Sequence, residues 1–172
     1  MTNKNYEILT KNLKKKLPRN DLEEYILDFL KSQNMGVLST SFNDIPRATP
    51  VEYYNNGATL YIIAEEGEKI KNIEKNPNIS FSIYASYSGW LSVKGVQITG
   101  KAKILTYPSK EFEEGLEYYD CSKNAEQLGI DENIILQDVK KMKMIKIESE
   151  KIELFDFSLK EKGYSEKQVL IL

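Results

Sequence analysis

The stretch that decides the fold runs from Met35 to Ile73 and reads MGVLSTSFNDIPRATPVEYYNNGATLYIIAEEGEKIKNI. It contains three short apolar segments separated by turn residues, and it ends in a segment with helical spacing. The Asn56-Gly57 pair is the strongest hairpin signal in the chain, because both residue types tolerate positive φ. We therefore expect three antiparallel strands followed at once by a helix over Glu68 to Lys75.

Two cations in this stretch are candidates for binding an anion. Arg47, Thr49 and Val51 alternate onto one face of the second predicted strand, so a guanidinium and a hydroxyl could approach the same phosphate. Lys69 lies in the first turn of the following helix, where free N–H groups and the positive end of the dipole favour an anion. The residues themselves predict a phosphate site at Arg47 and Lys69.

The segment before this stretch is predicted to be helical. Tyr6 to Leu17 has apolar residues at spacings of three and four, with lysines on the other side. We interpret this helix as a solvated lysine face over an apolar seam that docks on the body or on a partner subunit, and membrane-surface or RNA binding is the alternative. A second helix should begin after Pro18 and end near Gln33, with a buried stripe formed by Leu22, Ile26, Phe29 and Leu30.

The segment after this stretch alternates between strand and helix patterns. Asn76-Pro77-Asn78 should end the helix, and Asn43-Asp44 should form the first turn of the sheet. Further strands are expected at NISFSIYA, at WLSVKGVQITGKAKIL with bends at Gly95 and Gly100, and at MKMIKIE and KIELFDF on either side of Ser149-Glu150. Helices are expected over Pro108 to Tyr119 and over Asn124 to Lys141, with an interruption near Gly129.

These patterns predict one mainly β (α+β) domain over residues 1–172, a small barrel of six or seven antiparallel strands with peripheral helices. Its parts are N-terminal helices at 1–33, a barrel core at 35–105, a helical insertion at 108–141, and closing strands with a tail at 142–172.

The amino-acid composition excludes several classes of function. The net charge of −2 gives no general attraction for nucleic acid or anionic membrane, so we expect neither as a partner. The sequence starts without an apolar leader, and we expect a cytoplasmic protein. There is no histidine, which excludes Ser-His-Asp and Cys-His catalysis, imidazole-bound metals and histidine-ligated haem. We expect no metal site, and chemistry carried by an organic cofactor becomes the leading hypothesis.

The single cysteine, Cys121, lies near a predicted helix start, which can lower the pKa of a thiol. The alternative is a passive small side chain. A lone cysteine forms no internal disulfide, and this fits a reducing compartment.

The ordered motifs PR-x-TPV, K-x-x-N-I-x-x-NP and GW…G-x-A resemble the flavin-binding split barrels related to pyridoxamine-phosphate oxidase, in particular their general-stress and nitroimidazole-resistance-like bacterial branch. The resemblance covers roughly Leu22 to Leu105, with a looser similarity near Lys146 to Phe157. It implies a split barrel that is a homodimer, with FMN in a groove between the two subunits.

The resemblance also implies a set of cofactor-binding residues. The second strand would run along the flavin, the end of the third would touch the ribityl and ring region, Lys69 would bind phosphate, and the tryptophan of the GW pair would lie near the cofactor. The residues at these positions are Arg47, Ala48, Thr49, Pro50, Val51, Glu52, Ile62, Ile63, Lys69 and Trp90.

Several residues of this sequence differ from those of the oxidase, and the differences argue against the oxidase reaction in this protein. Thr49 and Glu68 stand where the oxidase has arginines, and Glu65, Glu66 and Glu68 compete with an anion for the helix dipole. The C-terminus KEKGYSEKQVLIL lacks the arginine-x-histidine pair that holds pyridoxal phosphate in the oxidase. We therefore do not expect pyridoxamine-phosphate oxidation.

The leading hypothesis is an FMN oxidoreductase that passes electrons or hydride between a reduced nicotinamide and a small organic acceptor. The alternatives are a non-enzymatic flavin or deazaflavin carrier or stress-related sensor, a haem-handling split barrel, and a nucleic-acid module that uses the basic segment from Lys14 to Arg19. No catalytic residue is predicted from the sequence.

Overall fold

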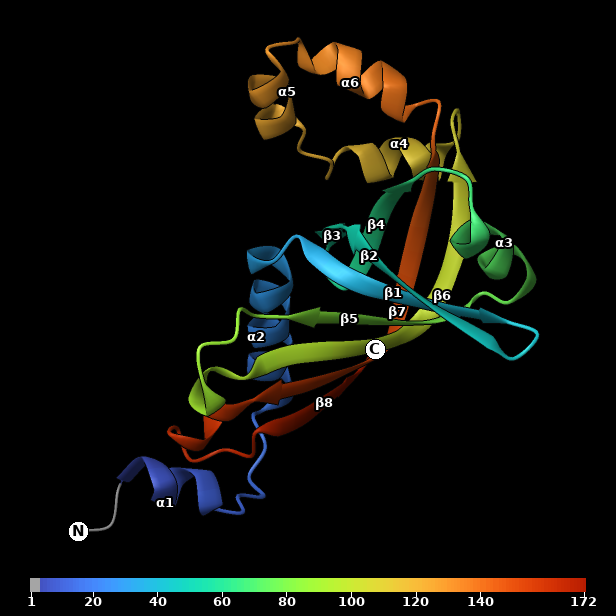
Figure 1. The fold of residues 1–172 in the computed structure, drawn as a ribbon. Helices are drawn as coiled ribbons and strands as arrows, with labels where there is room; N and C mark the ends of the chain where they lie inside the picture. Colours follow the sequence, from blue (N-terminus) through green and yellow to red (C-terminus); the bar gives the residue numbers. More distant parts are fainter. Residues whose placement is uncertain (1–3) are drawn as a thin grey trace.

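A computed structural model describes residues 4–172 as one antiparallel sheet with helices around it (Figure 1). The strands are β1 (Met35–Phe42), β2 (Ile45–Glu52), β3 (Tyr54–Asn56), β4 (Thr59–Ala64), β5 (Asn78–Tyr84), β6 (Lys94–Thr106), β7 (Lys143–Asp156) and β8 (Lys167–Ile171). The α-helices are α1 (Lys4–Thr10), α2 (Arg19–Ser32), α3 (Glu68–Lys75), α4 (Lys110–Leu116), α5 (Ser122–Leu128) and α6 (Glu132–Val139), and short 3-10 turns are η1 (Trp90–Ser92) and η2 (Phe157–Lys160).

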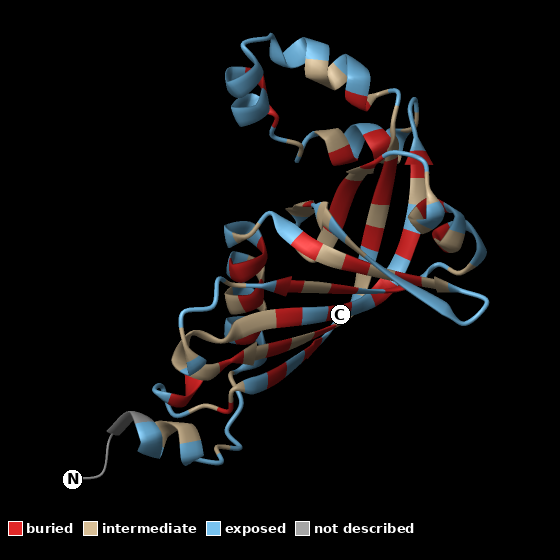
Figure 2. Ribbon diagram, viewed as in Figure 1, coloured by how far each residue is buried: buried red, intermediate tan, exposed pale blue. Residues whose placement is uncertain are grey.

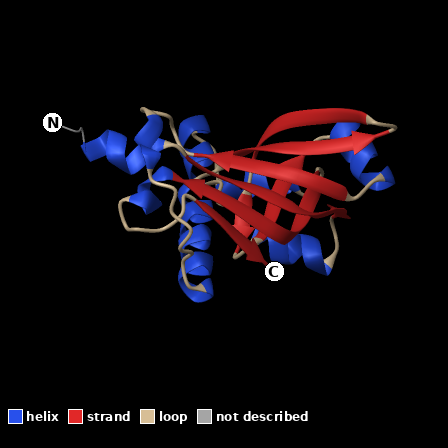
Figure 3. Cartoon of the chain, turned by 90° about the horizontal axis from the view of Figure 1, so that it is seen from below, coloured by secondary structure: helices blue, strands red, loops and turns tan. Residues whose placement is uncertain are grey.

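The sheet has the order β2-β1-β5-β6-β7-β4-β3, and β8 pairs with β7. It curves and twists, and the helices gather at its two ends (Figure 3). Its two terminal strands, β2 and β3, are consecutive in the chain and are separated by Tyr53 alone. The sheet is therefore a barrel that remains unclosed, in agreement with the mainly β, split-barrel prediction.

Tyr53 interrupts the second strand predicted within Met35 to Ile73, whose sequence is RATPVEYY. Its side chain is buried, its hydroxyl donates to the Leu30 carbonyl at 2.7 Å, and its N–H donates to the Asn34 carbonyl at 2.9 Å. Because both bonds go to the end of α2, Tyr53 cannot continue the ladder of either strand. The prediction of one continuous strand was wrong, and β2 and β3 diverge from this residue.

Local turn chemistry was predicted well. Asn43 and Asp44 have φ values of 51° and 61° and connect β1 to β2, while Gly57 has a φ of 57° in the turn from β3 to β4. Asparagine, aspartate and glycine are the residues that tolerate this left-handed region. The helix α3 has the predicted bounds, and Gly129 ends α5 in the left-handed conformation, as the expected interruption.

The long strands differ from the prediction in one respect. The pairing of β6 with β7 shifts at Gly100, where Glu150 is the extra residue in β7, and a Cβ on Gly100 would lie 2.2 Å from the Glu148 carbonyl oxygen. A bulge therefore bends the sheet at Gly100 as expected. The two closing strands predicted around Ser149-Glu150 are one strand, β7, because the chain bulges there and does not turn. With β3 and β8 the described strands number eight, against six or seven predicted.

Burial alternates along the strands, and the main core lies between the sheet and α2 (Figure 2). The four residues predicted as the stripe of α2 are all buried. A smaller core, formed by Tyr61, Leu105, Phe112, Val139 and Met144, attaches α4 and the end of α6 to β4 and β7. The helical arm of α5 and α6 extends away from the sheet (Figure 1).

The N-terminal helix is shorter than predicted. It ends at Thr10, and residues 11–18 have no regular structure because they hydrogen bond to the C-terminal strand region. The Lys15 carbonyl accepts from the Ser165 N–H at 2.8 Å, Lys16 donates to the Lys167 carbonyl, and Arg19 donates to the Ile171 carbonyl at 2.7 Å. These bonds cover the edge of β8. Among the helices of residues 4–172, none is both long and apolar enough to span a membrane.

A buried charge joins α2 to the sheet. The Asp156 carboxylate, 2% exposed, accepts hydrogen bonds from the Tyr25 hydroxyl at 2.7 Å and the Ser158 N–H at 2.9 Å, and the Lys94 ammonium lies 3.3 Å away. Burial alone would raise the pKa of Asp156, but these hydrogen bonds and the lysine charge outweigh it, and the pKa lies below its usual range. Asp156 therefore stabilises the fold in its ionised form.

We predict that Asp156→Asn lowers the free energy of unfolding at pH 7 by on the order of 3 kcal/mol, because it leaves Lys94 and Tyr25 without their charged partner. The depressed pKa means that this stabilisation is complete above about pH 4 and is lost as the pH falls through the folded-state pKa, so the two proteins should converge in acid. Urea unfolding at several pH values measures both effects. Asp138→Asn, which removes an exposed pair with Lys141, should change little. Equal effects of the two substitutions would contradict the assignment.

Candidate functional site

The split in the barrel lies between β2 and β4. β4 pairs with β7 along its whole length, but β3 covers its other edge only over Thr59–Tyr61, so the edge beyond, at 62–64, lacks a strand partner among the described residues. β2 passes on this side, with Cα atoms within 8 Å of β4. Backbone N–H and C=O groups at a free edge seek partners. The split is therefore a place where a flat ligand could meet backbone hydrogen-bonding groups.

Arg47 and Thr49 face the side of the sheet that α3 covers. Arg47 is paired across the strands with Thr40, and cross-strand partners project from the same face. The Thr40 hydroxyl accepts a hydrogen bond from the Asn72 amide of α3 at 3.1 Å, which fixes the helix over this face. Arg47 is also close enough to the helix start to lower the pKa of Glu68, although a hydrogen bond from Lys71 is the larger cause.

Lys69 is positioned by the same helix. It precedes Asn72 by three residues, so the two side chains lie on one side of α3, the side toward β1. Lys69 is half-buried, and its ammonium donates to the Glu65 carbonyl at 3.4 Å. Within residues 4–172, no ion pair within 4.0 Å involves Arg47 or Lys69. Both cations are available to an anion.

Thr49 supplies a test of whether a ligand fits here. Its hydroxyl oxygen is buried and has no hydrogen-bond partner within the described chain. A buried hydroxyl without a partner is destabilising by about 1–3 kcal/mol. It lies two residues from Arg47 on the same strand face. The orphaned hydroxyl and the two cations are donors of the kind that a phosphate ester uses, so the residues fit a ligand that carries a phosphate.

The other predicted cofactor residues are placed differently. Ala48, Pro50 and Glu52 are exposed on the opposite face of β2. The Ile62 side chain is fully buried in the main core and Ile63 is half-buried. At these positions β4 therefore contributes its backbone groups to the split.

Trp90 is remote from these residues within one subunit. It is 69% exposed on η1, which follows the end of β5, while α3 precedes the start of that strand. Seven extended residues separate the two ends by about 20 Å. Within one subunit, Arg47 and Thr49 thus lie on the strand face that is covered by the helix carrying Lys69, and Trp90 lies apart.

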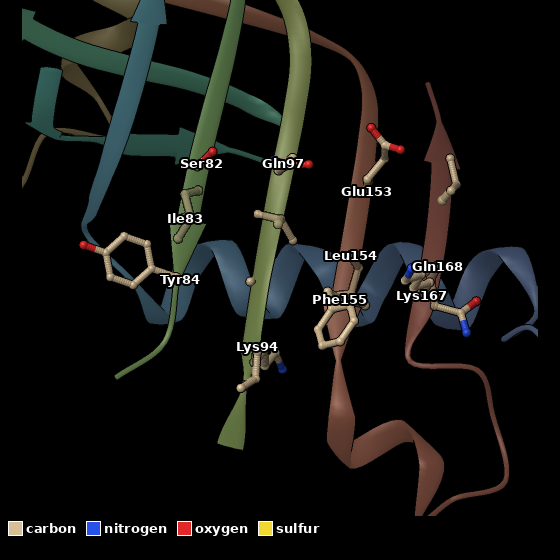
Figure 4. Close-up of a pocket in the computed structure, with 14 residues that line it drawn as sticks. Ser82, Ile83, Tyr84, Lys94, Gln97, Glu153, Leu154, Phe155, Lys167 and Gln168 are labelled. Carbon is tan, nitrogen blue, oxygen red and sulfur yellow. The ribbon is translucent and has the colours of Figure 1, made fainter. Parts of the chain in front are cut away.

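Two cavities contain residues that the sequence did not indicate. One, of about 590 Å³, lies on the outer face of β5 to β8 and is lined by Tyr84, Gln97 and Phe155 (Figure 4). The other, of about 460 Å³, lies between the Tyr53 break and the α4–α5 loop, with Glu52, Tyr54 and Asp120 in its wall, and we call it the junction pocket. No spacing in the sequence links Glu52 to Asp120, so only the fold reveals this pocket.

Cys121 has no sign of activation. It precedes α5, it is buried, and burial raises the pKa of its thiol, in contrast to the lowering that a helix start can produce. The passive interpretation of this cysteine is the one that the structure supports.

Comparisons with known proteins agree with this architecture. General stress protein 26 from Bacillus anthracis superposes with a TM-score of 0.59 at 20% identity, covering 88% of this chain and 98% of the other. A FAD-binding protein from Mesorhizobium loti gives 0.55 at 19% identity, with 77% and 89% covered. A proposed 5-nitroimidazole antibiotic resistance protein from Bacteroides thetaiotaomicron gives 0.57 at 14% identity, with 76% and 81% covered.

At these identities the solved structures show the fold alone. A search of curated proteins finds no match. The sequence model of the pyridoxamine 5'-phosphate oxidase family matches residues 22–154, which include the whole sheet except β8 and the end of β7. The chain therefore belongs to the pyridoxamine 5'-phosphate oxidase family.

Proposed function

We propose that this protein binds FMN and passes electrons or hydride between a reduced nicotinamide and a small organic acceptor. The observation that carries the proposal is the orphaned Thr49 hydroxyl, which lies on the same strand face as Arg47, opposite the helix that carries Lys69. Family membership and the FAD-binding structural neighbour support a flavin as the ligand.

The charges at the start of α3 are more favourable for binding an anion than the sequence indicated. Glu68 forms an ion pair with Lys71 at 2.8 Å, so its carboxylate is neutralised within the helix. Glu66 lies 3.5 Å from Lys143 of β7. Glu66 and Glu68 therefore have partners, whereas Glu65 forms no ion pair within residues 4–172, so one acidic charge is set against the two cations Arg47 and Lys69 beside the N–H groups of α3.

The roles of the chain follow from this geometry. When bound, the flavin supplies the redox chemistry. Arg47, Thr49 and Lys69 would hold its phosphate, and the backbone edge at 62–64 would hydrogen bond to its polar groups. The arginine-x-histidine pair of the oxidase is absent, and Arg19 is engaged with the Ile171 carbonyl. Pyridoxamine phosphate is therefore excluded from the proposal as the substrate.

We further propose that the functional unit is a homodimer formed through the outer face of β5 to β8. Tyr84, 67% exposed, stands on this face (Figure 4), and Val169, 50% exposed, lines the same cavity. The exposed Trp90 lies on η1, between β5 and β6. Apolar side chains gathered on one sheet face favour burial against a partner. A partner seated there would bring its Trp90 toward a cofactor that the first subunit cannot reach with its own.

The phosphate site is tested by titrating FMN into the protein and following flavin fluorescence. Arg47→Ala and Lys69→Ala should each raise the dissociation constant by about ten- to hundredfold, the effect of losing one charge-assisted hydrogen bond. Lys75→Ala, at the far end of the same helix, should stay within about twofold. Loaded wild-type protein should oxidise NADH or NADPH when an acceptor is present. A protein that leaves FMN fluorescence unchanged, or variants that all behave alike, would refute the site.

A second experiment compares two threonines on neighbouring strands. Thr49→Val should weaken FMN binding and leave the melting temperature unchanged or higher, because the lost hydroxyl has no partner in the protein. Thr40→Val should lower the free energy of unfolding by about 1 kcal/mol, because Asn72 loses its acceptor. Calorimetric melting and FMN titration provide the two readings. If Thr49→Val destabilises as much as Thr40→Val, the orphaned hydroxyl is not a ligand donor.

The dimer surface is tested by Val169→Glu, which places a charge in the centre of the proposed interface. We expect this variant to sediment as a monomer and to lose FMN binding, although it lies far from Arg47 and Lys69. Leu128→Glu, an exposed apolar site on α5, is the matched control and should remain dimeric. A wild-type monomer with full FMN affinity would contradict the shared cofactor site.

A further inference from the structure

The backbone of β2 presents a hydrogen-bonding edge to the split. β2 pairs with β1 along one side, from Glu52 opposite Met35 to Ile45 opposite Phe42. It is the terminal strand of the sheet order, so its other side has no strand partner within residues 4–172 and faces the split. Each N–H and C=O group on that side is open to a ligand. The direction in which each residue of β2 points therefore decides what the split can bind.

The turn before β2 fixes the direction of its first residue. Phe42 pairs with Ile45, so the loop between them has two residues, and both have positive φ. A turn of this kind is closed by a hydrogen bond from the residue after the loop to the residue before it, so the Ile45 backbone points toward β1. Because this direction alternates along an antiparallel strand, Arg47, Thr49 and Val51 also point toward β1. The even-numbered residues of β2 therefore point their backbone groups into the split.

Two further hydrogen bonds agree with this alternation. The register of β1 and β2 places Tyr53 opposite Asn34, and the Tyr53 N–H donates to the Asn34 carbonyl at 2.9 Å, so the odd-numbered series points toward β1 at this end too. The carbonyl of Ser41, the partner of Pro46, accepts from the Asn76 amide at 3.1 Å and so points away from β2. The same assignment thus holds at both ends of the strand.

Two prolines remove most of the donors from this edge. Pro46 and Pro50 have no N–H, and both occupy even-numbered positions, where the ladder with β1 loses nothing by it. Between them, Ala48 alone faces the split with both an N–H and a C=O group. Glu52 is the other even-numbered residue with an N–H, but it adjoins Tyr53, where the chain passes to the strand that pairs with β4 and the split is narrowest. The exposed Ala48 has more room for a ligand.

This pattern excludes a peptide strand and admits one edge of a small ring. A strand that adds to a sheet needs a donor and an acceptor at every second residue of the edge, and the two prolines interrupt that series on either side of Ala48. A single N–H beside a single C=O instead matches a ring amide, whose own C=O and N–H are adjacent. The pyrimidine ring of a flavin has such an edge, an imide N–H at N3 between two carbonyls.

The opposite wall of the split also contributes one residue. β3 and β4 are joined by a two-residue loop, so the backbone of Thr59 points toward β3, and the alternation gives Tyr61 and Ile63 the same direction. β3 reaches only as far as Tyr61, so Ile63 points into the split. A flat ligand that binds at Ala48 would thus find a second backbone donor and acceptor on β4.

We propose that Ala48 is the specificity-determining residue of the split and that it selects a cyclic imide. Its N–H donates to a carbonyl of the imide, and its C=O accepts from the imide N–H. Pro46 and Pro50 restrict the edge to this one position, so the ring binds in a single register. The inference rests on the proposed flavin function, which it deepens by naming the part of the ring that the chain recognises.

Three flavins test the imide on the wild-type protein, each titrated while its own fluorescence is followed. 3-Methyl-FMN keeps the phosphate, the ribityl chain and the ring system of FMN but has a methyl group in place of the imide proton. We expect it to bind about tenfold more weakly than FMN, because one hydrogen bond is lost and the methyl group blocks the approach to Ala48. 5-Deaza-FMN keeps the imide and should bind within about threefold of FMN.

Two substitutions at one position locate the effect. Ala48→Pro removes the donor, as Pro46 and Pro50 do at their own positions, and should raise the dissociation constant of FMN about tenfold. It should also reduce the preference for FMN over 3-methyl-FMN to less than about threefold, because the ring is no longer held in register. Ala48→Ser keeps the N–H and should keep the wild-type preference.

A third proline tests the direction of the strand. The N–H of Val51 points toward β1 and belongs to the ladder, so Val51→Pro should lower the melting temperature by several degrees or prevent folding. Ala48→Pro removes an N–H that points into the split and should melt close to the wild type. Thermal melting of the two variants measures the difference. Equal losses would overturn the assignment of Ala48 to the open edge.

Failure of this inference is distinguishable from failure of the flavin function. If FMN and 3-methyl-FMN bind equally tightly, the role of Ala48 is overturned and the flavin function stands. If Ala48→Ser loses the preference as fully as Ala48→Pro, the backbone N–H is not the recognising group, and the inference is again overturned. If none of the three flavins binds, the flavin function is refuted and the imide assignment with it.

Discussion

The constraint on which this barrel depends is the pair of hydrogen bonds that Tyr53 makes to the end of α2. A hydroxyl bond to the Leu30 carbonyl and an N–H bond to the Asn34 carbonyl remove one residue from the sheet. The ring also packs edge to face on Phe81 at 5.6 Å, beneath a glycine, Gly36, whose missing side chain leaves room for the Phe81 ring. The strand on one side of Tyr53 can then pair with β1, and the strand on the other side with β4. A continuous strand would have closed the barrel and removed the split.

The split is the part of this architecture where groups are available to bind a ligand. β4 leaves a backbone edge free, β2 passes beside it, and α3 begins at the end of β4 with its N–H groups and Lys69 near the strand that carries Arg47. Two of the three acidic residues around the helix start, Glu66 and Glu68, are paired with Lys143 and Lys71, which leaves Glu65 against the two cations. The opposite face of the same strand borders the junction pocket, with Glu52 and Tyr54 in its wall.

The parts of the fold that were predictable from the sequence are those encoded locally. The stripe on α2, the turn at Asn43-Asp44, the helix α3 and the bend at Gly100 each depend on residues close together in the chain. The Tyr53 break was missed because its cause is two carbonyls about twenty residues upstream. The helix over Tyr6 to Leu17 was overextended because Lys16 and Leu17, at its predicted end, hydrogen bond to β8, a strand that had been interpreted as a tail. At the site, alternation along β2 predicts that Arg47 and Thr49 share a face, whereas the orphaned state of Thr49 and the proximity of Glu52 to Asp120 follow only from the tertiary structure.

The most direct test of the central claim is a crystal structure of the protein soaked with FMN. If the split is the cofactor site, the phosphate will lie within 4 Å of both the Arg47 guanidinium and the Lys69 ammonium, it will accept a hydrogen bond from Thr49, and the ring system will lie against the backbone edge of β4. A phosphate bound elsewhere, with Arg47 and Lys69 directed into separate regions even across a twofold axis, would contradict the account.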